Sequence, residues 1–341
     1  MALHVAILGA GNISGTHARA ASAAGLTIAA VHGRHPDKVR AMADAYGAAP
    51  YLDLEACLAH PSLDAVLIGS PSGVHADQGI LAASRGLHVL VEKPIDVTVE
   101  RADALIDAAS RSDVRLGVMF QDRTQPAFVA LQRALGSGRL GRPQLTAATV
   151  RWYRPPEYYG ASGWRGTWAL DGGGALMNQG IHTLDLLLWL FGPLARVSAR
   201  VATMFHTIEV EDTAVALLEF ESGAVATYEA TTAAYPGYPR RLEITTSEGT
   251  VSIEHSQVIR ADLRSGAESL IVVDASRPNQ GPSSPVVSDI SGHQRLVEDF
   301  ADAVRLRREP LCSGAEGRRS LVAARAIYES ARTGRVVDVM S

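Results

Sequence analysis

The first 120 residues alternate short apolar runs with helix-forming stretches, and this alternation limits the possible folds more than any other feature. Strands are expected at 5–8, 27–31, 65–69, 89–91 and 116–120. Helices are expected between them, at 13–24, 36–46, 74–85 and 98–110. Continuous apolar strands separated by helices are typical of a parallel sheet that is covered on both faces. The pattern predicts an α/β fold that begins with a doubly wound parallel sheet.

The rest of the chain follows a different pattern. A helix is expected at 127–135, a strand at 145–152 and a strongly apolar helix at 175–191. Mostly strands follow, at 195–205, 213–220, 224–230, 241–246, 250–254 and 270–273, and then a loop rich in Pro, Ser and Gly at 276–285. Two helices, at 289–308 and 316–333, close the chain. The sequence therefore predicts two domains, 1–121 and 122–341. The second is an α+β domain with a large, mostly antiparallel open sheet, whose last helices can pack back on the first domain.

Composition narrows the class of protein. The 341 residues carry 32 basic and 36 acidic side chains, a net charge of −4, so no broad surface for nucleic acid is expected. Two cysteines far apart in the sequence, Cys57 and Cys312, imply no disulfide framework and favour a reducing, cytoplasmic location. The N-terminal residues lack the basic region of a signal peptide, and no apolar run approaches the length that spans a bilayer. No membrane partner is therefore expected.

A glycine-rich turn, Gly9-Ala10-Gly11-Asn12-Ile13-Ser14, follows the first expected strand. Gly9 permits a tight turn, and Gly11 lets the backbone approach a pyrophosphate at the positive end of the next helix. Ser14 stands where a third glycine or an alanine is usual. Because the turn joins the first strand and helix of an alternating unit, it predicts a dinucleotide site with Gly9, Gly11, Asn12 and Ile13 as contacts.

The end of the second strand bears on the choice of dinucleotide. NAD sites usually have an acidic residue there, which binds the ribose 2′-hydroxyl group. This chain has His32-Gly33-Arg34 instead. An arginine suits a 2′-phosphate, because its planar guanidinium can donate two parallel hydrogen bonds. The sequence favours NADP, with Gly33 and Arg34 as contacts, and leaves NAD as the alternative.

Two further segments carry groups suited to proton transfer. Lys93 follows an expected strand within Glu92-Lys93-Pro94, at the sheet edge where a nicotinamide would lie. Asn178, His182 and Asp185 are spaced four and three residues apart in an apolar helix, so they share one face. Polar groups on a buried helix cost free energy unless they are paired or functional. We interpret them as catalytic; the alternative is a core histidine held by Asp185.

Together these segments resemble the Gfo/Idh/MocA oxidoreductases over essentially the whole chain. The resemblance rests on the turn at 9–14, Ser-Pro-Ser-Gly-Val-His at 70–75, Glu-Lys-Pro at 92–94, Gln-Asp-Arg at 121–123 and the glycine-rich helix start at 172–185. It implies a Rossmann domain followed by an α/β domain whose open sheet often forms an oligomer interface. It also implies hydride transfer between NAD or NADP and a CH–OH or C=O group of a sugar, sugar derivative or cyclic polyol.

The resemblance also implies roles for individual residues. Lys93 would orient the reacting oxygen and His182 would act as the acid/base, with Asp185 orienting His182. Asn178 stands where many members have Asp, so it can bind a hydroxyl group but cannot accept a proton. Further cofactor contacts are implied at Ser70, Pro71, His75, Glu92, Lys93, Gln121, Trp164 and Arg165. Expected substrate contacts are Lys93, Arg123, Tyr153, Asn178 and His182, and no metal ligands are predicted.

Two other functions stay open at this point. One is a non-catalytic NAD(P)-binding sensor or subunit, and the other is a glycoside hydrolase that uses NAD transiently. The sequence also predicts a homodimer or homotetramer, because both alternating sets of residues in the strand at 213–220 are largely apolar.

Overall fold

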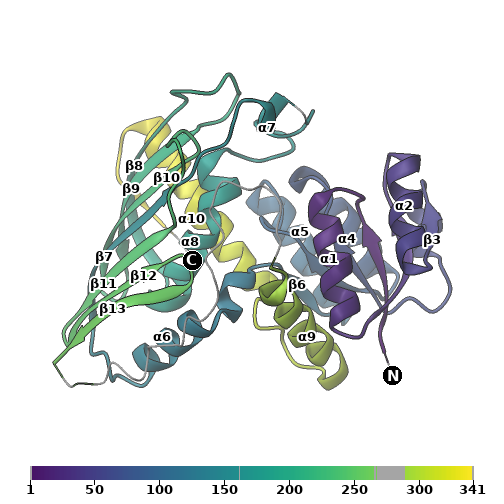
Figure 1. Ribbon diagram of the computed structural model, residues 1–341, viewed down its shortest axis with the longest axis horizontal. Coiled ribbons are helices and arrows are strands. Elements are labelled where there is room, and N and C mark those ends of the chain that lie inside the picture. Colours follow the sequence, from purple (N-terminus) through teal and green to yellow (C-terminus); the bar gives the residue numbers. More distant parts are fainter. Residues whose placement is uncertain (1, 161, 265, 267–288, 340–341) are drawn as a thin grey trace. The chain divides into compact units, whose positions relative to one another are not determined.

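The computed structural model describes residues 2–160, 162–264, 266 and 289–339. These residues form two compact units, each built around its own sheet (Figure 1). The first unit comprises the described residues up to Gln121 together with 289–318, and the second comprises those from Asp122 to Gly266 and from Arg319 onward. The expected strand at 270–273 and the expected loop at 276–285 lie outside the described residues.

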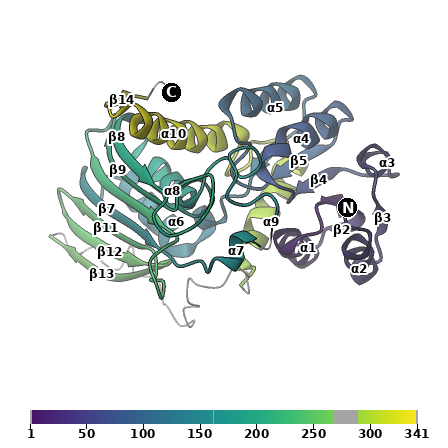
Figure 2. The ribbon, with the colours of Figure 1, turned by 90° about the horizontal axis from the view of Figure 1, so that it is seen from above.

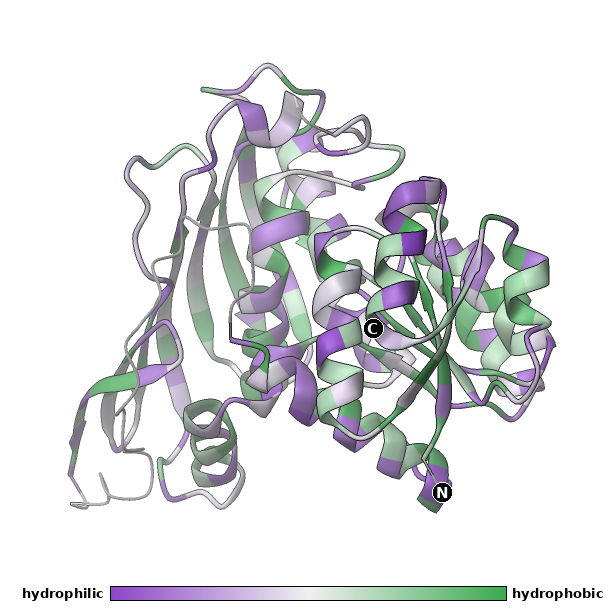
Figure 3. Ribbon diagram, turned by 45° about the vertical axis from the view of Figure 1, so that its right-hand side comes forward, coloured by the Kyte–Doolittle hydropathy of each residue, from purple (hydrophilic) through white to green (hydrophobic). Residues whose placement is uncertain are grey.

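The first unit contains a six-stranded sheet in the order β3-β2-β1-β4-β5-β6. Its strands are β1 (His4–Leu8), β2 (Thr27–His32), β3 (Ala49–Tyr51), β4 (Ala65–Ile68), β5 (His88–Val91) and β6 (Leu116–Val118). Every pair is parallel. The strands are mostly hydrophobic along their length (Figure 3), and all four residues of β4 are buried, as a sheet covered on both faces requires. The predicted doubly wound sheet is confirmed.

Helices cover both faces of this sheet. They are α1 (Asn12–Ala23), α2 (Pro36–Tyr46), α3 (Leu54–Leu58), α4 (His75–Ser84), α5 (Val99–Arg111) and α9 (Ser291–Leu306), with a short 3₁₀ turn, η1 (Ser72–Val74). α1, α2 and α9 lie on one face, and α4 and α5 on the other (Figures 1 and 2). The sequence did not predict β3 and α3, because neither is long enough to show an apolar period.

The second unit contains an eight-stranded sheet in the order β13-β12-β11-β7-β10-β9-β8-β14. Its strands are β7 (Pro143–Arg151), β8 (Leu194–Ala202), β9 (Thr213–Phe220), β10 (Val225–Thr231), β11 (Arg241–Thr246), β12 (Gly249–Glu254), β13 (Gln257–Leu263) and β14 (Val337–Asp338). Strands β7 and β10 pair in parallel, and the other neighbours pair antiparallel. The predicted large, mostly antiparallel sheet is confirmed.

Helices cover one face of the large sheet. The helical segments are η2 (Gln121–Thr124), α6 (Pro126–Gly136), α7 (Glu157–Gly160), a π-helical turn η3 (Ala175–Gly180), α8 (Ile181–Phe191) and α10 (Gly314–Thr333), whose residues to Arg318 belong to the first unit. α6, α8 and the later part of α10 lie against the same face of the sheet (Figure 2). On β9, Ala216 and Leu218 are buried, whereas Val215 and Leu217 on the other face are 49% and 43% exposed.

Two expectations for the second unit need correction. The helix expected at 175–191 is not α-helical throughout, since it begins with the π-helical turn η3. The strand expected at 195–205 ends at Ala202, because the buried Asp212 carboxylate accepts hydrogen bonds from the amides of Met204, Phe205 and His206 and turns the chain there. In addition, the sequence did not predict β13, in which apolar and polar residues do not alternate regularly.

Candidate active site

The glycine-rich turn lies between β1 and α1, where the strand order of the first sheet reverses. Gly9 has φ +115°, and a Cβ atom there would lie 2.6 Å from Ser14 Oγ and 2.8 Å from the carbonyl oxygen of Gly69. Ser14 is buried and its hydroxyl donates a 3.0 Å hydrogen bond to that same carbonyl. The serine at the third position therefore ties the turn to the end of β4, and its polar group is satisfied.

The N-terminus of α1 has the features of an anion site. Gly11 is its N-cap and makes no side-chain capping bond, and the first turn contains no acidic residue. Gly11 and Asn12 are exposed, and Ile13 is half-buried. The first amides of a helix have no partners within the helix and carry the positive end of its dipole, which suits a phosphate group. In doubly wound sheets, ligands bind at this reversal of strand order.

Gly33 and Arg34 follow β2 directly. Gly33 is buried, and a Cβ atom there would lie 3.0 Å from Val39 and 3.2 Å from Ala10, so the turn at β2 packs against the turn at β1. Arg34 is exposed. The nearest acidic residue along the chain is Asp37, in the first turn of α2. The strand therefore ends next to a cationic side chain.

Lys93 directly follows Glu92 at the end of β5, and a cis peptide bond joins it to Pro94. The Lys93 amide donates a 3.0 Å hydrogen bond to Glu92 Oε2, and Glu92 Oε1 lies 2.9 Å from Nε2 of the fully buried His17 on α1. Burial opposes ionisation of Glu92. The hydrogen bond and charge of His17, with the charges of Lys93 and His293, outweigh burial and hold the pKa of Glu92 at about 2. An anionic carboxylate therefore fixes the backbone that carries Lys93.

His75 joins the loops that follow β4 and β5. Its ring nitrogens lie 2.9 Å from the carbonyl oxygen of Pro94 and 3.0 Å from that of Ser70. Burial lowers the pKa of His75, and a neutral ring can donate to only one of these oxygens at a time. The Ser70 hydroxyl donates to Gln78 at 2.7 Å, and Pro71 is half-buried. His75 thus connects the loop that contains Ser70 with the loop that contains Lys93.

In the second unit, the π-helical turn η3 carries Asn178. The Asn178 amide nitrogen donates a 2.6 Å hydrogen bond to Oδ1 of the buried Asp171, and its oxygen accepts from Gln179 at 3.2 Å. The Asp171 carboxylate thus contacts the asparagine that stands where many proteins of the family that the sequence resembles have aspartate. Asp171 was not predicted as a site residue, although its position directly before the three glycines at 172–174 is a signal for one.

His182 lies in the first turn of α8, within the electrostatic influence of Asp122. Burial opposes ionisation of Asp122, but the charges of Arg240 and His182 outweigh burial and hold the pKa of Asp122 at about 2. Arg240 also makes an ion pair with Asp122. Asp122 is therefore an anion whose charge interacts with that of His182. The sequence indicated its two neighbours, Gln121 and Arg123, as site residues but not Asp122 itself.

Asp185 and Arg123 form a buried ion pair. Arg123 Nε and Nη2 donate hydrogen bonds of 2.8 and 2.7 Å to the two carboxylate oxygens, and the Ser320 hydroxyl donates another of 2.8 Å. Arg123 is only 1% exposed. These contacts tie η2, α8 and α10 together. The expected catalytic role of Asp185 and the expected substrate contact of Arg123 stay predictions.

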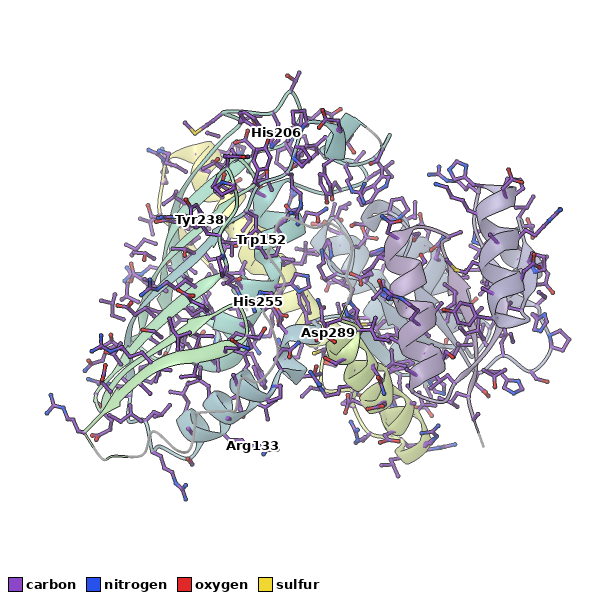
Figure 4. The ribbon with its side chains drawn as sticks, viewed as in Figure 1. Arg133, Trp152, His206, Tyr238, His255 and Asp289 are labelled. Atoms are coloured by element: carbon purple, nitrogen blue, oxygen red, sulfur yellow. The ribbon has the colours of Figure 1, made fainter. Side chains whose placement is uncertain are left out.

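The aromatic segment after β7 contains a cluster of rings and guanidinium groups. The Arg165 guanidinium lies 4.5 Å from the centre of the Tyr158 ring and 5.0 Å from that of Trp164. Tyr153 contacts Tyr235 edge to face, with ring centres 5.2 Å apart. His206 lies beside α7 (Figure 4), its ring centre 4.7 Å from that of Tyr159. Rings and donors of this kind suit the faces and hydroxyl groups of a sugar.

The predicted site residues therefore fall into two sets. The first unit holds Gly9, Gly11, Asn12, Ile13, Gly33, Arg34, Ser70, Pro71, His75, Glu92, Lys93 and Gln121, and the second holds Arg123, Tyr153, Trp164, Arg165, Asn178, His182 and Asp185. Within the described ranges, no group of three or more His, Cys, Asp or Glu side chains is arranged to hold a metal ion. No helix in the part of the chain that the structure describes could cross a membrane.

Comparisons with known proteins show the family of the chain. Residues 3–120 match the oxidoreductase family with an NAD-binding Rossmann fold, and residues 128–252 match the GFO/IDH/MocA C-terminal domain. Inositol 2-dehydrogenase of Rhizobium meliloti is 27% identical over 99% of this chain and 100% of its own. D-apiose dehydrogenase of Paraburkholderia graminis is 28% identical over 98% of this chain and 89% of its own.

A solved structure also covers the whole chain. The WlbA dehydrogenase of Bordetella pertussis, in complex with NADH and UDP-GlcNAcA, is 31% identical, with a TM-score of 0.89 over 100% of this chain and 98% of its own. The order of strands, the glycine-rich turn and both domain matches lead to one conclusion. The chain is an oxidoreductase of the Gfo/Idh/MocA family, with an NAD-binding Rossmann fold.

Proposed function

We propose that the protein transfers a hydride between a nicotinamide and a CH–OH or C=O group of a sugar, sugar derivative or cyclic polyol. The observation that carries this proposal is the position of Lys93. It is the second residue after β5, and its amide donates a hydrogen bond to the Glu92 carboxylate. β5 is two strands from β1, whose following turn forms the anion site of α1. A cationic side chain thus lies on the same sheet edge as the expected dinucleotide.

The residues of the first unit fit a dinucleotide. The turn at Gly9 has no room for a Cβ atom, and the α1 N-terminus has no capping side chain. Gly9, Gly11, Asn12 and Ile13 would hold the pyrophosphate, with Ser70, Pro71, His75, Glu92 and Gln121 along the rest of the cofactor. Trp164 and Arg165 of the second unit are further contacts in the proposal. When bound, the nicotinamide accepts or donates the hydride.

In the direction of oxidation, Lys93 and His182 act on the same substrate oxygen. His182 removes the hydroxyl proton, while the Lys93 ammonium donates a hydrogen bond to the developing alkoxide. Asn178 binds a neighbouring hydroxyl group, with its orientation set by the bond to Asp171. Tyr153 contacts the sugar. Asp185 and Arg123 hold α8 so that His182 faces the substrate.

The cofactor in this proposal is NADP. Arg34 is exposed directly after β2, where an NAD site usually has an acidic residue. A guanidinium at this position can bind the 2′-phosphate. The complex of WlbA contains NADH, so both cofactors are compared in the test below.

The protein acts as a homodimer or homotetramer in this proposal. Val215 and Leu217 of β9 and Leu145 of β7 are 49%, 43% and 54% exposed on the face of the large sheet opposite its helices. Exposed apolar side chains on one sheet face favour contact with a second copy. A cytoplasmic location is proposed from the two cysteines, Cys57 and Cys312, which are free and buried.

A substrate screen tests the activity. The purified chain is incubated with NADP or NAD and with inositols, free sugars, sugar acids and UDP-linked uronic acids, and reduced nicotinamide is followed by absorbance. Steady reduction with at least one of these compounds supports the proposal. Cleavage of a glycoside without net reduction would indicate the hydrolase instead. Cofactor binding with no turnover across the panel would indicate a sensor.

A further inference from the structure

A buried carboxyl group outside the proposed catalytic set holds the start of the helix that carries Asn178 and His182. Glu211, just before β9, is 3% exposed. Its Oε1 accepts a 2.8 Å hydrogen bond from the Leu176 amide, and its Oε2 accepts one of 3.0 Å from the Gly174 amide. Its backbone carbonyl accepts a third, of 3.1 Å, from the Ala175 amide. One residue thus binds three successive amides at the start of η3.

The glycines before η3 are explained by the same contact. A Cβ atom at Gly174 would lie 1.7 Å from the carbonyl oxygen of Glu211. A Cβ atom at Gly173 would lie 2.0 Å from the hydroxyl oxygen of Tyr328 on α10. The Tyr328 hydroxyl donates a 3.0 Å hydrogen bond to Glu211 Oε1. The two glycines therefore allow the chain to pack directly against Glu211 and Tyr328.

Because η3 is a π-helical turn, the positions of Asn178 and His182 depend on these contacts. A π-helical turn is rare and unstable by itself, so its position depends on the groups that bind it from outside. Asn178 lies within η3, and His182 follows in the first turn of α8. Any shift of the amides at 174–176 is passed along the helix to both side chains. A 1 Å displacement of a catalytic group can lower a rate about a hundredfold.

We propose that the ionised carboxylate of Glu211 is a positioning residue, which fixes η3 and so sets the places of Asn178 and His182 during hydride transfer. This inference rests on the proposed function. The carboxylate accepts two amide bonds and one hydroxyl bond, and all three are stronger when it is charged. A neutral carboxyl group would have to use one oxygen as a donor, although every neighbour that bonds to it is itself donating.

The Glu211 carboxyl group changes its charge within the pH range in which the protein can be studied. Burial raises the pKa of Glu211 to about 7, against the opposing effect of the Leu176 and Gly174 amides and the Tyr328 hydroxyl. The titratable groups that interact with it are Tyr328 from α10, Tyr228 from β10 and Tyr159 from α7, and Asp171 lies near Tyr328 and Tyr159. Burial raises the pKa of all three tyrosines, so none of them changes charge near neutral pH.

The test compares Glu211→Gln with Glu221→Gln, which makes the same chemical change at an exposed turn. Hydrogen exchange of the segment 172–182, followed by mass spectrometry, reports the order of η3 without any need for turnover. Loss of a charged acceptor should accelerate exchange in Glu211→Gln about ten- to a hundredfold. In the unaltered chain, exchange corrected for its intrinsic rate should rise as the pH falls below 7, and this dependence should be absent in Glu211→Gln.

Kinetics supply the second readout. In Glu211→Gln, kcat should fall about tenfold or more while the KM for the nicotinamide is unchanged, because the altered residue acts on the helix of Asn178 and His182. Tyr328→Phe, which removes one donor and keeps the carboxylate, should give a smaller loss and serves if Glu211→Gln does not fold. Unchanged exchange in both variants would overturn the proposal. Faster exchange with an unchanged kcat would also overturn it.

Failure of the proposed function gives a different result. If the unaltered chain oxidises no compound of the panel, the exchange data still decide whether Glu211 fixes η3.

Discussion

The carboxylate of Asp185 receives two parallel hydrogen bonds from Arg123, from Nε at 2.8 Å and from Nη2 at 2.7 Å. Both side chains are almost completely buried, so water solvates neither charge. A buried ion pair contributes little against an apolar pair of the same size, but breaking it leaves one charge without its partner. The pair therefore fixes the position of α8 relative to η2 within the second unit.

Removal of one partner should destabilise the second unit. We expect Asp185→Leu to lower the free energy of unfolding by about 3–5 kcal/mol, measured by urea denaturation. The double variant Arg123→Met with Asp185→Leu should recover much of this loss, because no buried charge remains. The exposed pair of Arg151 and Glu229 is the control, and Arg151→Ala should cost no more than about 1 kcal/mol. Equal losses in the single and double variants would contradict this account.

The choice of cofactor should depend on Arg34. We expect Arg34→Ser to weaken NADPH binding about ten- to a hundredfold, because a bidentate contact to the 2′-phosphate is lost, and to leave NADH binding nearly unchanged. Fluorescence titration of both reduced cofactors measures this. Arg40→Ser changes an exposed arginine of α2, the helix that follows Arg34, and should affect neither cofactor. Preferential binding of NADH by the unaltered chain would refute the NADP assignment.

Stability in acid should depend on Glu92. The pKa of Glu92 in the folded protein is about 2, below its ordinary value of 4.5. Because the folded-state pKa is lowered, the carboxylate stabilises the fold above pH 4.5, and this contribution, about 3 kcal/mol, is lost as the pH falls towards 2. We expect Glu92→Gln to show a smaller loss of stability between pH 4.5 and 2 than the unaltered chain. Parallel pH profiles for the two proteins would show that the charge of Glu92 does not stabilise the fold.

Assembly should depend on the face of the large sheet opposite its helices. We expect Leu217→Glu to shift sedimentation towards the monomer, because it places a charge on the sheet face where Val215 and Leu145 are also exposed. Leu52→Glu is the control, since Leu52 is 58% exposed in the first unit. A monomeric unaltered chain, or an oligomer unaffected by Leu217→Glu, would rule out this interface.

Much of the first unit could be predicted because local rules determine it. Pro36 at the start of α2 and Gly47 after its end fixed both bounds of that helix, and continuous apolar runs identified five of the six strands. β3 was not predicted, because it has only three residues and contains Pro50. In the second unit, the exact range of β9 was predicted from a largely apolar run that ends at the turn residues 221–223.

The site was harder to predict where it depends on contacts between distant segments. The spacing of Asn178, His182 and Asp185 identified the helix, but not the π-helical turn, because η3 depends on Glu211, 31 or more residues further along the chain. Likewise, no local signal connects His17 with Glu92, which are 75 residues apart. Such pairs arise only when the sheet has brought the elements together.

The claim that Lys93 and His182 act on one substrate oxygen is tested most directly by a double-mutant cycle on hydride transfer. Single-turnover rates are measured for Lys93→Met, His182→Asn and the double variant, with the best substrate of the screen and saturating cofactor. Each single change should lower the rate by at least about a hundredfold without loss of cofactor binding. The double variant should be little slower than the slower single variant, because groups that act as a unit are not additive. Losses that multiply in the double variant, or near-normal rates in either single variant, would contradict the account.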